Sequence, residues 1–238
     1  MRIFLLFLAL NAFADNEIFV EQSGSNAAIN LEQLGSSNLI GGTSAVSGTM
    51  TALDLDGINM TLEINQIGAG NIFRSDAFDS DYISALFDFQ GDSNVMDILV
   101  NSGGAYTADY ADFNIQVTGG SNTFDIEVAE NSNADYLDLD WIIDGDNNEF
   151  EFDIDYENAT SYIDIFGDSN ALTFAGSGYA GTTSSDSGYF YLDLTGDSNT
   201  YTITQASTLA RDYLKITSNA SNSVVCIVQN DGSSTTSC

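Results

Sequence analysis

The side chains most able to do chemistry in this 238-residue chain are its carboxylates. Asp and Glu number 35 against four Lys and Arg, histidine is absent, and the net charge is −31. A chain without histidine has neither a Ser-His-Asp triad nor an imidazole metal ligand. Paired acids such as Asp138 and Asp140 are the residue type that glycosidases use, but acids at alternate strand positions first of all form a solvated face. We therefore predict that the chain is not an enzyme and has no catalytic residue.

Three of these acids recur at one offset in a repeated pattern, namely Asp97, Asp125 and Glu151. Stacked like charges repel by roughly 0.2–1 kcal/mol per pair in a sheet. A hard cation such as calcium, bound by oxygen ligands, would relieve the repulsion, and dissolved salt would screen it without a specific site. No Asp-x-Asp-x-Asp-Gly loop is present. We therefore predict no cofactor and assign no metal site. The alternative is that calcium binds to the ladder of Asp97, Asp125 and Glu151.

The charge and composition exclude several classes of protein. Nucleic-acid binding needs cations that displace phosphate counterions, and an anionic lipid surface is disfavoured for the same reason. Apolar residues make up 43% of the chain, with fifteen Phe and eleven Tyr, which is too many for a disordered chain. Proline, which removes a ladder hydrogen bond inside a strand, is absent. The composition favours a folded chain made mostly of sheet.

A four-residue turn organises the chain. Gly-Asp-Ser-Asn occurs three times, at 91–94, 167–170 and 196–199, and looser Gly-x-x-Asn copies lie at 35–38, 68–71, 119–122 and 145–148. Residues 219–222 look like an eighth copy with the Gly replaced. The final Asn of the copies recurs about every 26 residues, which is typical of a solenoid or repeat array. These residues are Asn38, Asn71, Asn94, Asn122, Asn148, Asn170, Asn199 and Asn222.

Apolar residues alternate with polar ones on both sides of each turn. After Asn122 they are Phe124, Ile126 and Val128, and before it they are Val117 and Ile115. Period-2 alternation predicts strands with one buried face. Each repeat is then strand, turn, strand and a longer return. A β-solenoid explains why residue types return at fixed offsets, whereas a meander, the alternative, does not. We predict an all-β fold, a right- or left-handed β-solenoid of about eight rungs of about 26 residues.

Two further features of the repeats lead to predictions. Thr43 to Asn59 has no clear turn copy and is expected to be an inserted loop. Six tyrosines precede strands, and they either cap those strands or form an exposed stripe that binds glycans or surfaces. They are Tyr82, Tyr110, Tyr136, Tyr162, Tyr189 and Tyr213.

The N-terminal part, clearest in residues 18–71, resembles the curlin-repeat family. The turns 22–26, 33–38 and 66–71 look like its Gln-x-Gly-x-x-Asn core, the first one residue short. Gln205, six residues after Asn199, looks like its second Gln, and Gln33 and Gln229, seven residues after Asn26 and Asn222, lie one position out of place. The resemblance implies secreted subunits that stack as flat β-solenoids into amyloid-like fibres for adhesion and biofilm. It also implies inward ladders of Gln33, Gln66 and the turn Asn residues. Later copies depart from the pattern, with Phe89, Val117 or Ile143 in place of the Gln.

The only cysteines are Cys226 and Cys238. Counted from Asn222, Cys226 falls at an inward position of the last rung. A disulfide between the two would fold a tail, residues 223–238, back onto that rung and cover part of its open edge. The first fourteen residues predict a secretory signal peptide, with an apolar run too short to span a bilayer. A secreted location permits the disulfide.

These observations predict a cleaved signal peptide at residues 1–14, followed by a solenoid repeat domain at residues 15–238. The expected function is that of a secreted, extracellular structural or adhesive protein that self-associates end to end. The alternative is a monomeric calcium-dependent adhesin or a carbohydrate-binding fibre module. The expected partners are further copies of the chain, a cell surface or a glycan, without nucleic acid and without an integral membrane segment.

Overall fold

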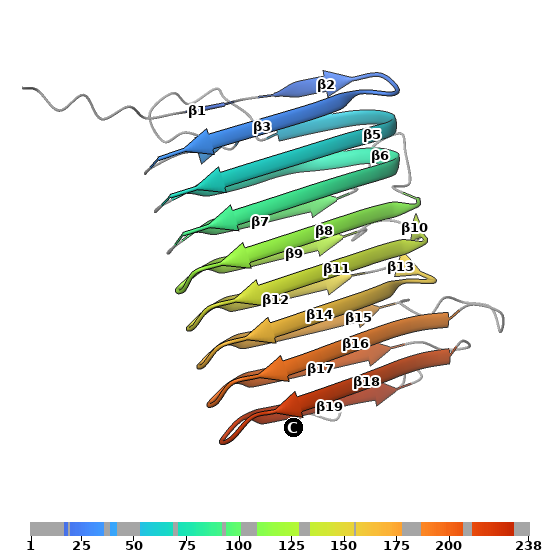
Figure 1. Ribbon diagram of the computed structural model, residues 1–238. Helices are drawn as coiled ribbons and strands as arrows, with labels where there is room; N and C mark the ends of the chain where they lie inside the picture. Colours follow the sequence, from blue (N-terminus) through green and yellow to red (C-terminus); the bar gives the residue numbers. More distant parts are fainter. Residues whose placement is uncertain are drawn as a thin grey trace, which may run out of the picture.

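The computed structural model describes residues 17–18, 20–35, 39–41, 53–68, 71–91, 94–100, 109–128, 134–154, 156–177, 187–206 and 211–230. All regular secondary structure within these ranges is β-strand. The strands lie one below another in two layers, like the coils of a flattened spring, with the first rungs at the top and the last at the bottom (Figure 1). The predicted signal peptide, residues 1–14, lies outside the described residues.

The strands that precede the turn form one face of the solenoid, which we call the first face. Its strands are β3 (Ala28–Leu34), β8 (Ala111–Thr118), β11 (Leu137–Asp144), β14 (Thr160–Phe166), β16 (Ser187–Thr195) and β18 (Arg211–Asn219), with the C-terminal parts of β5 (Leu53–Ile67) and β6 (Ile72–Gln90).

The strands that follow the turn form the second face. They are β1 (Glu17–Ile18), β2 (Glu21–Ser23), β4 (Leu39–Ile40), β7 (Val95–Val100), β9 (Thr123–Val128), β12 (Glu149–Ile154), β15 (Ala171–Ser177), β17 (Thr200–Ala206) and β19 (Val224–Asn230), with the N-terminal parts of β5 and β6. A separate pair, β10 (Ala134–Asp135) and β13 (Tyr156–Glu157), joins two of the returns.

Every strand pairing in the described part of the chain is parallel and joins one rung to the next. Trp141 of β11 lies between Ile115 of β8 and Ile163 of β14. Each residue therefore stacks on its counterpart one repeat away, which is why the same residue types return at the same offsets. The β-solenoid prediction is confirmed, and eight strand segments follow one another along the described first face.

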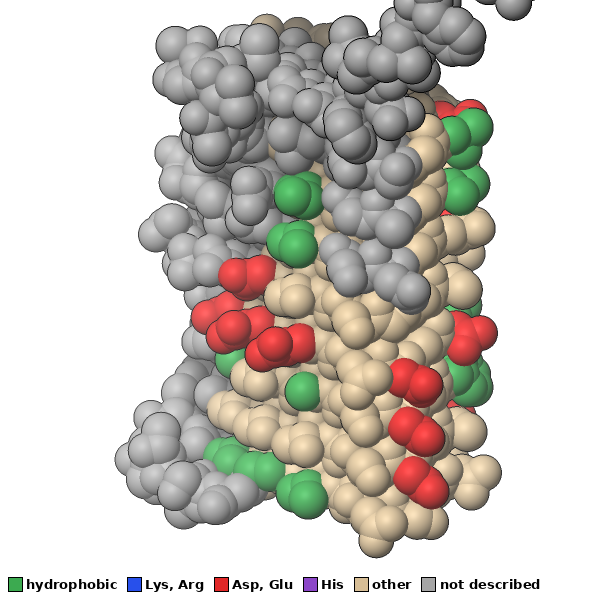
Figure 2. Space-filling view, turned by 90° about the vertical axis from the view of Figure 1, so that its left-hand side faces the viewer, with side chains coloured by type: hydrophobic (Ala, Val, Ile, Leu, Met, Phe, Trp, Pro, Cys, Tyr) green, Lys and Arg blue, Asp and Glu red, His purple; other side chains and the backbone are tan. Residues whose placement is uncertain are grey.

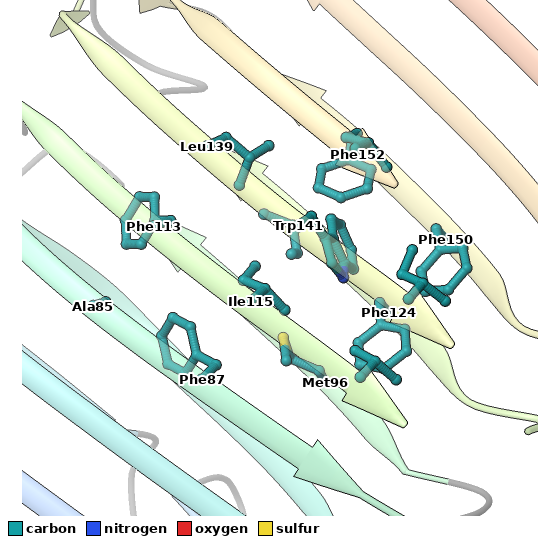
Figure 3. Close-up of a cluster of buried hydrophobic side chains, with 14 of the residues drawn as sticks. Ala85, Phe87, Met96, Phe113, Ile115, Phe124, Leu139, Trp141, Phe150 and Phe152 are labelled. Atoms are coloured by element: carbon teal, nitrogen blue, oxygen red, sulfur yellow. The ribbon is translucent and has the colours of Figure 1, made fainter. Parts of the chain in front are cut away.

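The interior is a single column of apolar side chains between the two faces. Along β11 the residues alternate strictly between buried and exposed, as the period-2 pattern predicts. Trp141 stands edge-on to Phe150 and Phe152 of the second face, with ring centroids 5.2 and 4.2 Å away. Figure 3 shows these rings interdigitating with Phe124, Met96 and Ile115. Packing of this density makes each core side chain sensitive to truncation.

The geometry of the turns explains why they contain glycine. Gly167 has φ +135°, and a Cβ there would lie 2.0 Å from the carbonyl oxygen of Gly145 in the rung before. Gly196 meets Gly167 in the same way. At these two turns the rungs approach each other too closely for a side chain, which explains the Gly at the first turn position. The third turn residue, for example Ser169 or Ser198, also has positive φ.

One prediction about the chain path is wrong. Residues 53–59 of the expected inserted loop belong to β5, which pairs with β2 and β6 before it passes the corner at Asn59. Residues 57–59 form a corner that does not have the Gly-x-x-Asn sequence, which is why no turn was predicted there. Gly57-Ile58-Asn59 stacks on Gly24-Ser25-Asn26, at the opposite corner from the Gly-x-x-Asn turns. Residues 42–52 lie outside the described residues.

Candidate functional site: side-chain ladders and open ends

The conserved geometry of the turns rests on a ladder of buried asparagines. The backbone N–H of Asn94 donates to Oδ1 of Asn122 at 2.7 Å, and the same bond joins Asn122 to Asn148 at 2.9 Å. It continues from Asn148 to Asn170 at 2.8 Å and from Asn170 to Asn199 at 2.6 Å. Each side chain thus satisfies a buried donor of the neighbouring rung, which would otherwise carry a large desolvation cost. The ladder is built of backbone-to-side-chain bonds rather than stacked amides.

The amide nitrogens of four turn asparagines, Asn71, Asn94, Asn170 and Asn199, donate to the carbonyls of turn glycines. Nδ2 of Asn71 donates to the Gly68 carbonyl at 3.1 Å, and Nδ2 of Asn94 donates to Gly91 at 3.0 Å, both within one turn. In the later rungs the bond crosses to the preceding turn, from Asn199 to the Gly167 carbonyl at 3.0 Å. Asn suits this corner because one side chain can both accept from the neighbouring rung and donate to a turn carbonyl.

The last turn departs from the prediction. Asn38 lies outside the described residues, and Asn222 is exposed with φ 56°, which corresponds to Ser198 in the rung before. The ladder position is taken by Ser223, whose hydroxyl accepts from the Asn199 backbone N–H at 3.1 Å. The prediction of Asn222 as a ladder residue is therefore wrong. The true copy is 220–223, in which Ala220 stands beside Gly196 because Thr195 pairs with Asn219.

The shift of one residue also moves the cysteine. Cys226 pairs with Thr202, an outward position, whereas Val225 and Ile227 continue the inward columns of Tyr201 and Ile203. The prediction that Cys226 lies in the core is wrong. Cys226 is not a free thiol in the described part of the chain, and Cys238 lies outside that part, so the disulfide stays a prediction. Residues 224–230 of the predicted tail form β19 and belong to the solenoid.

Two glutamine ladders lie near the two ends of the stack. Nε2 of Gln66 donates to Oε1 of Gln33 at 2.9 Å in the buried interior of the first face. Nε2 of Gln229 donates to Oε1 of Gln205 at 2.9 Å on the second face. Measured from Ser223, Gln229 is six residues further on, the same offset as Gln205 from Asn199. Stacked amides of this kind tie adjacent rungs together.

The acids form columns on the surface. Asp97 pairs with Asp125, which pairs with Glu151, so the predicted ladder is in register, and Asp125 and Glu151 are exposed. No group of three or more acids, cysteines or histidines arranged to hold a metal ion is found among the described residues. Figure 2 shows acidic side chains stacked one above another on the edge that carries the turns.

The turns themselves carry an acidic column that was not predicted from the sequence. Oδ1 of Asp146 accepts from the Asp168 backbone N–H at 2.6 Å, and Oδ1 of Asp168 accepts from Asp197 in the same way. Asp197 in turn accepts from Ser221 at 2.7 Å. The repeated Asp at the second turn position was the available signal. These bonds give each carboxylate a structural partner in the next rung.

Two aspartates on the first face have raised pKa values. Burial raises the pKa of Asp138, and the neighbouring Asp112 and Asp140 raise it further. Burial likewise raises the pKa of Asp164, with Asp193 and Asp140 adding to the shift. Stacked carboxylates one rung apart therefore resist ionising together.

The six predicted tyrosines divide into separate stacks. Tyr82, Tyr110 and Tyr136 lie at the corner before the first face, with centroids 4.7 Å apart and all with positive φ. Tyr162 stacks on Tyr191 at 4.6 Å, and Tyr189 stacks on Tyr213 at 4.7 Å, on the face of the sheet itself. The tyrosines are therefore both packed against one another and largely exposed.

The two ends of the stack leave inward columns uncovered. At the C-terminal end, Val225 is 39% exposed and Ile227 is 43% exposed, although Tyr201 and Ile203, one rung earlier, are fully buried. At the N-terminal end, Ile29 and Leu31 are only partly buried, whereas Leu62 and Ile64 beside them are buried. In the described part of the chain, β18 and β19 pair only toward the N-terminal side and β3 only toward β5.

Comparisons with known proteins identify no relative: no protein-family model, no curated protein and no solved structure matches the chain. The resemblance to curlin repeats therefore stands on the turn motifs alone. A search of the described residues for a helix of the length and apolarity needed to cross a membrane finds none.

Proposed function

We propose that this protein is a structural subunit that assembles end to end, each copy continuing the solenoid of the next. The observation that carries the proposal is the partial exposure of inward apolar side chains at both ends. Apolar surface of this kind gains about 25 cal/mol for each Å² removed from water. Unpaired strand edges also template further pairing.

The two ends are complementary along the same columns. Following the pairings through all rungs of the first face, Ile29 and Leu214 are the two ends of one column. Leu31 and Ile216 are the two ends of the next. A second copy placed in register would therefore set β3 below β18, with Ile29 on Leu214 and Leu31 on Ile216. Apolar residues then meet apolar residues, as they do along both columns except at Ser161, which lies between Leu139 and Phe190.

The charges at the ends favour the same arrangement. Lys215 and Arg211, two of the four cations, both lie in β18. In the continued register Lys215 would stand on Asn30 of the next copy, whose side chain bonds to Glu63 at 2.7 Å, and close to Glu32. Opposite charges across a junction help fix register and steer association. An acidic chain therefore presents its cations at the end that would meet acids.

The biological setting is proposed from the resemblance. A divergent curlin-like subunit, exported by the signal peptide and stapled by the disulfide Cys226–Cys238, would form extracellular amyloid-like fibres that serve adhesion and biofilm. We propose no catalytic role and no required cofactor. A monomeric calcium-dependent adhesin is the competing function, and it predicts a large stability gain on adding calcium without fibres.

Electron microscopy of the purified chain with and without calcium tests the assembly. We expect fibres in both conditions, and Ile227→Lys should abolish them because it places a charge in the buried junction. Val224→Lys is the matched control, since Val224 lies on the same strand but pairs with the outward Thr200. A chain that stays monomeric at high concentration, or equal loss of fibres in both variants, would overturn the proposal.

A further inference from the structure

Three strands near the C-terminal end form a hollow on the first face. Their outward side chains make a grid, in which Tyr162, Tyr191 and Lys215 form one column. Asp164, Asp193 and Thr217 form the next column. The hollow is lined by these six residues and by Leu192, all from β14, β16 and β18. Aromatic walls with a few convergent polar groups are typical of small-molecule sites.

One tyrosine of this grid, Tyr191, has no aromatic ring stacked on the side that faces β18. Tyr162 and Tyr191 are stacked at 4.6 Å with an interplanar angle of 8°, so nothing enters between them. The stack does not continue into β18, because that strand places Lys215 beside Tyr191. The neighbouring stack does continue, from Tyr189 to Tyr213 at 4.7 Å. The Tyr191 ring therefore ends its stack at the hollow and is held in position by Tyr162.

The polar groups around this ring face both accept and donate hydrogen bonds. Asp164 and Asp193 lie side by side on adjacent strands and supply carboxylate acceptors, while Lys215 and Thr217 supply donors. A ligand with many hydroxyl groups can use both kinds at once. An anionic ligand would be opposed by the two carboxylates and by the net charge of −31. Lys215 already places one cation beside these carboxylates, which weakens the attraction of the hollow for a cationic ligand.

We propose that this hollow binds a neutral oligosaccharide. The C–H face of one sugar ring packs on Tyr191, and its hydroxyls bond to Asp164, Asp193 and Lys215. Tyrosine suits this role because its rigid ring gives a large contact area at a small cost in conformational entropy. The site lies on the side of the solenoid, so its binding does not depend on end-to-end assembly and is measured equally well on dispersed chains.

Isothermal titration of the full chain with four neutral hexasaccharides tests the proposal. The probes are cellohexaose, maltohexaose, laminarihexaose and mannohexaose, with hexagalacturonate as the anionic comparison. We expect at least one neutral probe to bind, and Tyr191→Ala to weaken its binding by about tenfold. Tyr110→Ala is the control, because Tyr110 is also a stacked surface tyrosine, at the corner and away from the hollow.

Two further variants keep the test decisive if Tyr191→Ala disturbs the fold. Tyr191→Phe should retain binding, and Asp193→Asn, at an exposed position, should weaken it while the far-ultraviolet circular dichroism stays that of the wild type. Absence of binding by all four neutral probes would overturn the proposal. So would equal weakening by Tyr110→Ala, or binding of hexagalacturonate as tight as that of the best neutral probe.

Discussion

The middle and the last rung of this solenoid have the same architecture but different surroundings. Trp141 in β11 has neighbours on both sides and is fully buried, whereas Ile227 in β19 has a neighbour on one side only and is 43% exposed. Both face inward in their rungs. The comparison shows that burial in a solenoid is supplied by the adjacent rung rather than by the rung itself. An end rung is therefore incomplete until another rung covers it.

Truncating a central side chain should have the largest effect. Trp141→Ala removes a ring that contacts Phe124, Phe150 and Phe152, and we expect it to lower the free energy of unfolding by about 3–5 kcal/mol. Ile227→Ala on dispersed chains should cost less than about 1 kcal/mol, because that side chain is half-exposed already. Guanidinium unfolding measures both. Similar losses of unfolding free energy for the two variants would contradict the proposed difference between a middle rung and an end rung.

A smaller effect is expected at the asparagine ladder. Asn148→Ala leaves the Asn122 backbone N–H without its 2.9 Å acceptor in a buried corner, so it should cost about 1–3 kcal/mol. Asn222→Gly, at an exposed position of positive φ that Gly tolerates, should change stability by no more than about 0.5 kcal/mol. The same unfolding measurement applies. A larger loss of unfolding free energy for Asn222→Gly would show that Asn222, and not Ser223, is the ladder residue of the last turn.

The smallest effect is a pH dependence that belongs to the middle rungs. The folded-state pKa values of Asp138 and Asp164 are raised, so the native state holds these protons more tightly than the unfolded state. Their contribution to stability therefore increases as the pH falls from neutral toward about 4 and is lost as the pH rises. Asp138→Asn/Asp164→Asn should be more stable than the wild type at pH 7, with the difference shrinking toward pH 4.

Thermal unfolding at both pH values measures this difference. Asp97→Asn serves as the control, since Asp97 is an acid in another column, on the second face. A double variant that is less stable than the wild type at pH 7, or a difference that grows as the pH falls, would show that these carboxylates stabilise the fold when charged.

The sequence predicted the stacking because the physics of a solenoid repeats at each turn. Counting from Asn122 places Phe124 and Ile126 inside, and both are buried. The same count failed at the end, where Asn222 resembles the ladder residue in type but Ser223 occupies its place. A register error of one residue moves every following side chain to the other face, which is how Cys226 was assigned to the core.

Other features depend on neighbours that a single repeat does not reveal. The six tyrosines were predicted to precede strands, yet Tyr162, Tyr189 and Tyr213 lie within β14, β16 and β18. The rings divide between a corner stack and two stacks on the first face. Which stack a ring joins is set by its distance from the following turn, because the turns are in register: Tyr136 lies twelve residues before Asn148, whereas Tyr162 lies only eight before Asn170. The hollow beside Tyr191 likewise exists only once Lys215 is placed beneath it by the pairing of β16 with β18.

The most direct test of end-to-end continuation is a cryo-electron microscopy reconstruction of the assembled fibres that resolves the junction between two copies. The account predicts that the strand spacing of roughly 4.8 Å runs without interruption across it. β18 of one copy should pair in parallel with β3 of the next, with Leu214 on Ile29 and Ile216 on Leu31. Fibres in which copies meet through their side faces, with Ile227 still open to solvent, would contradict it.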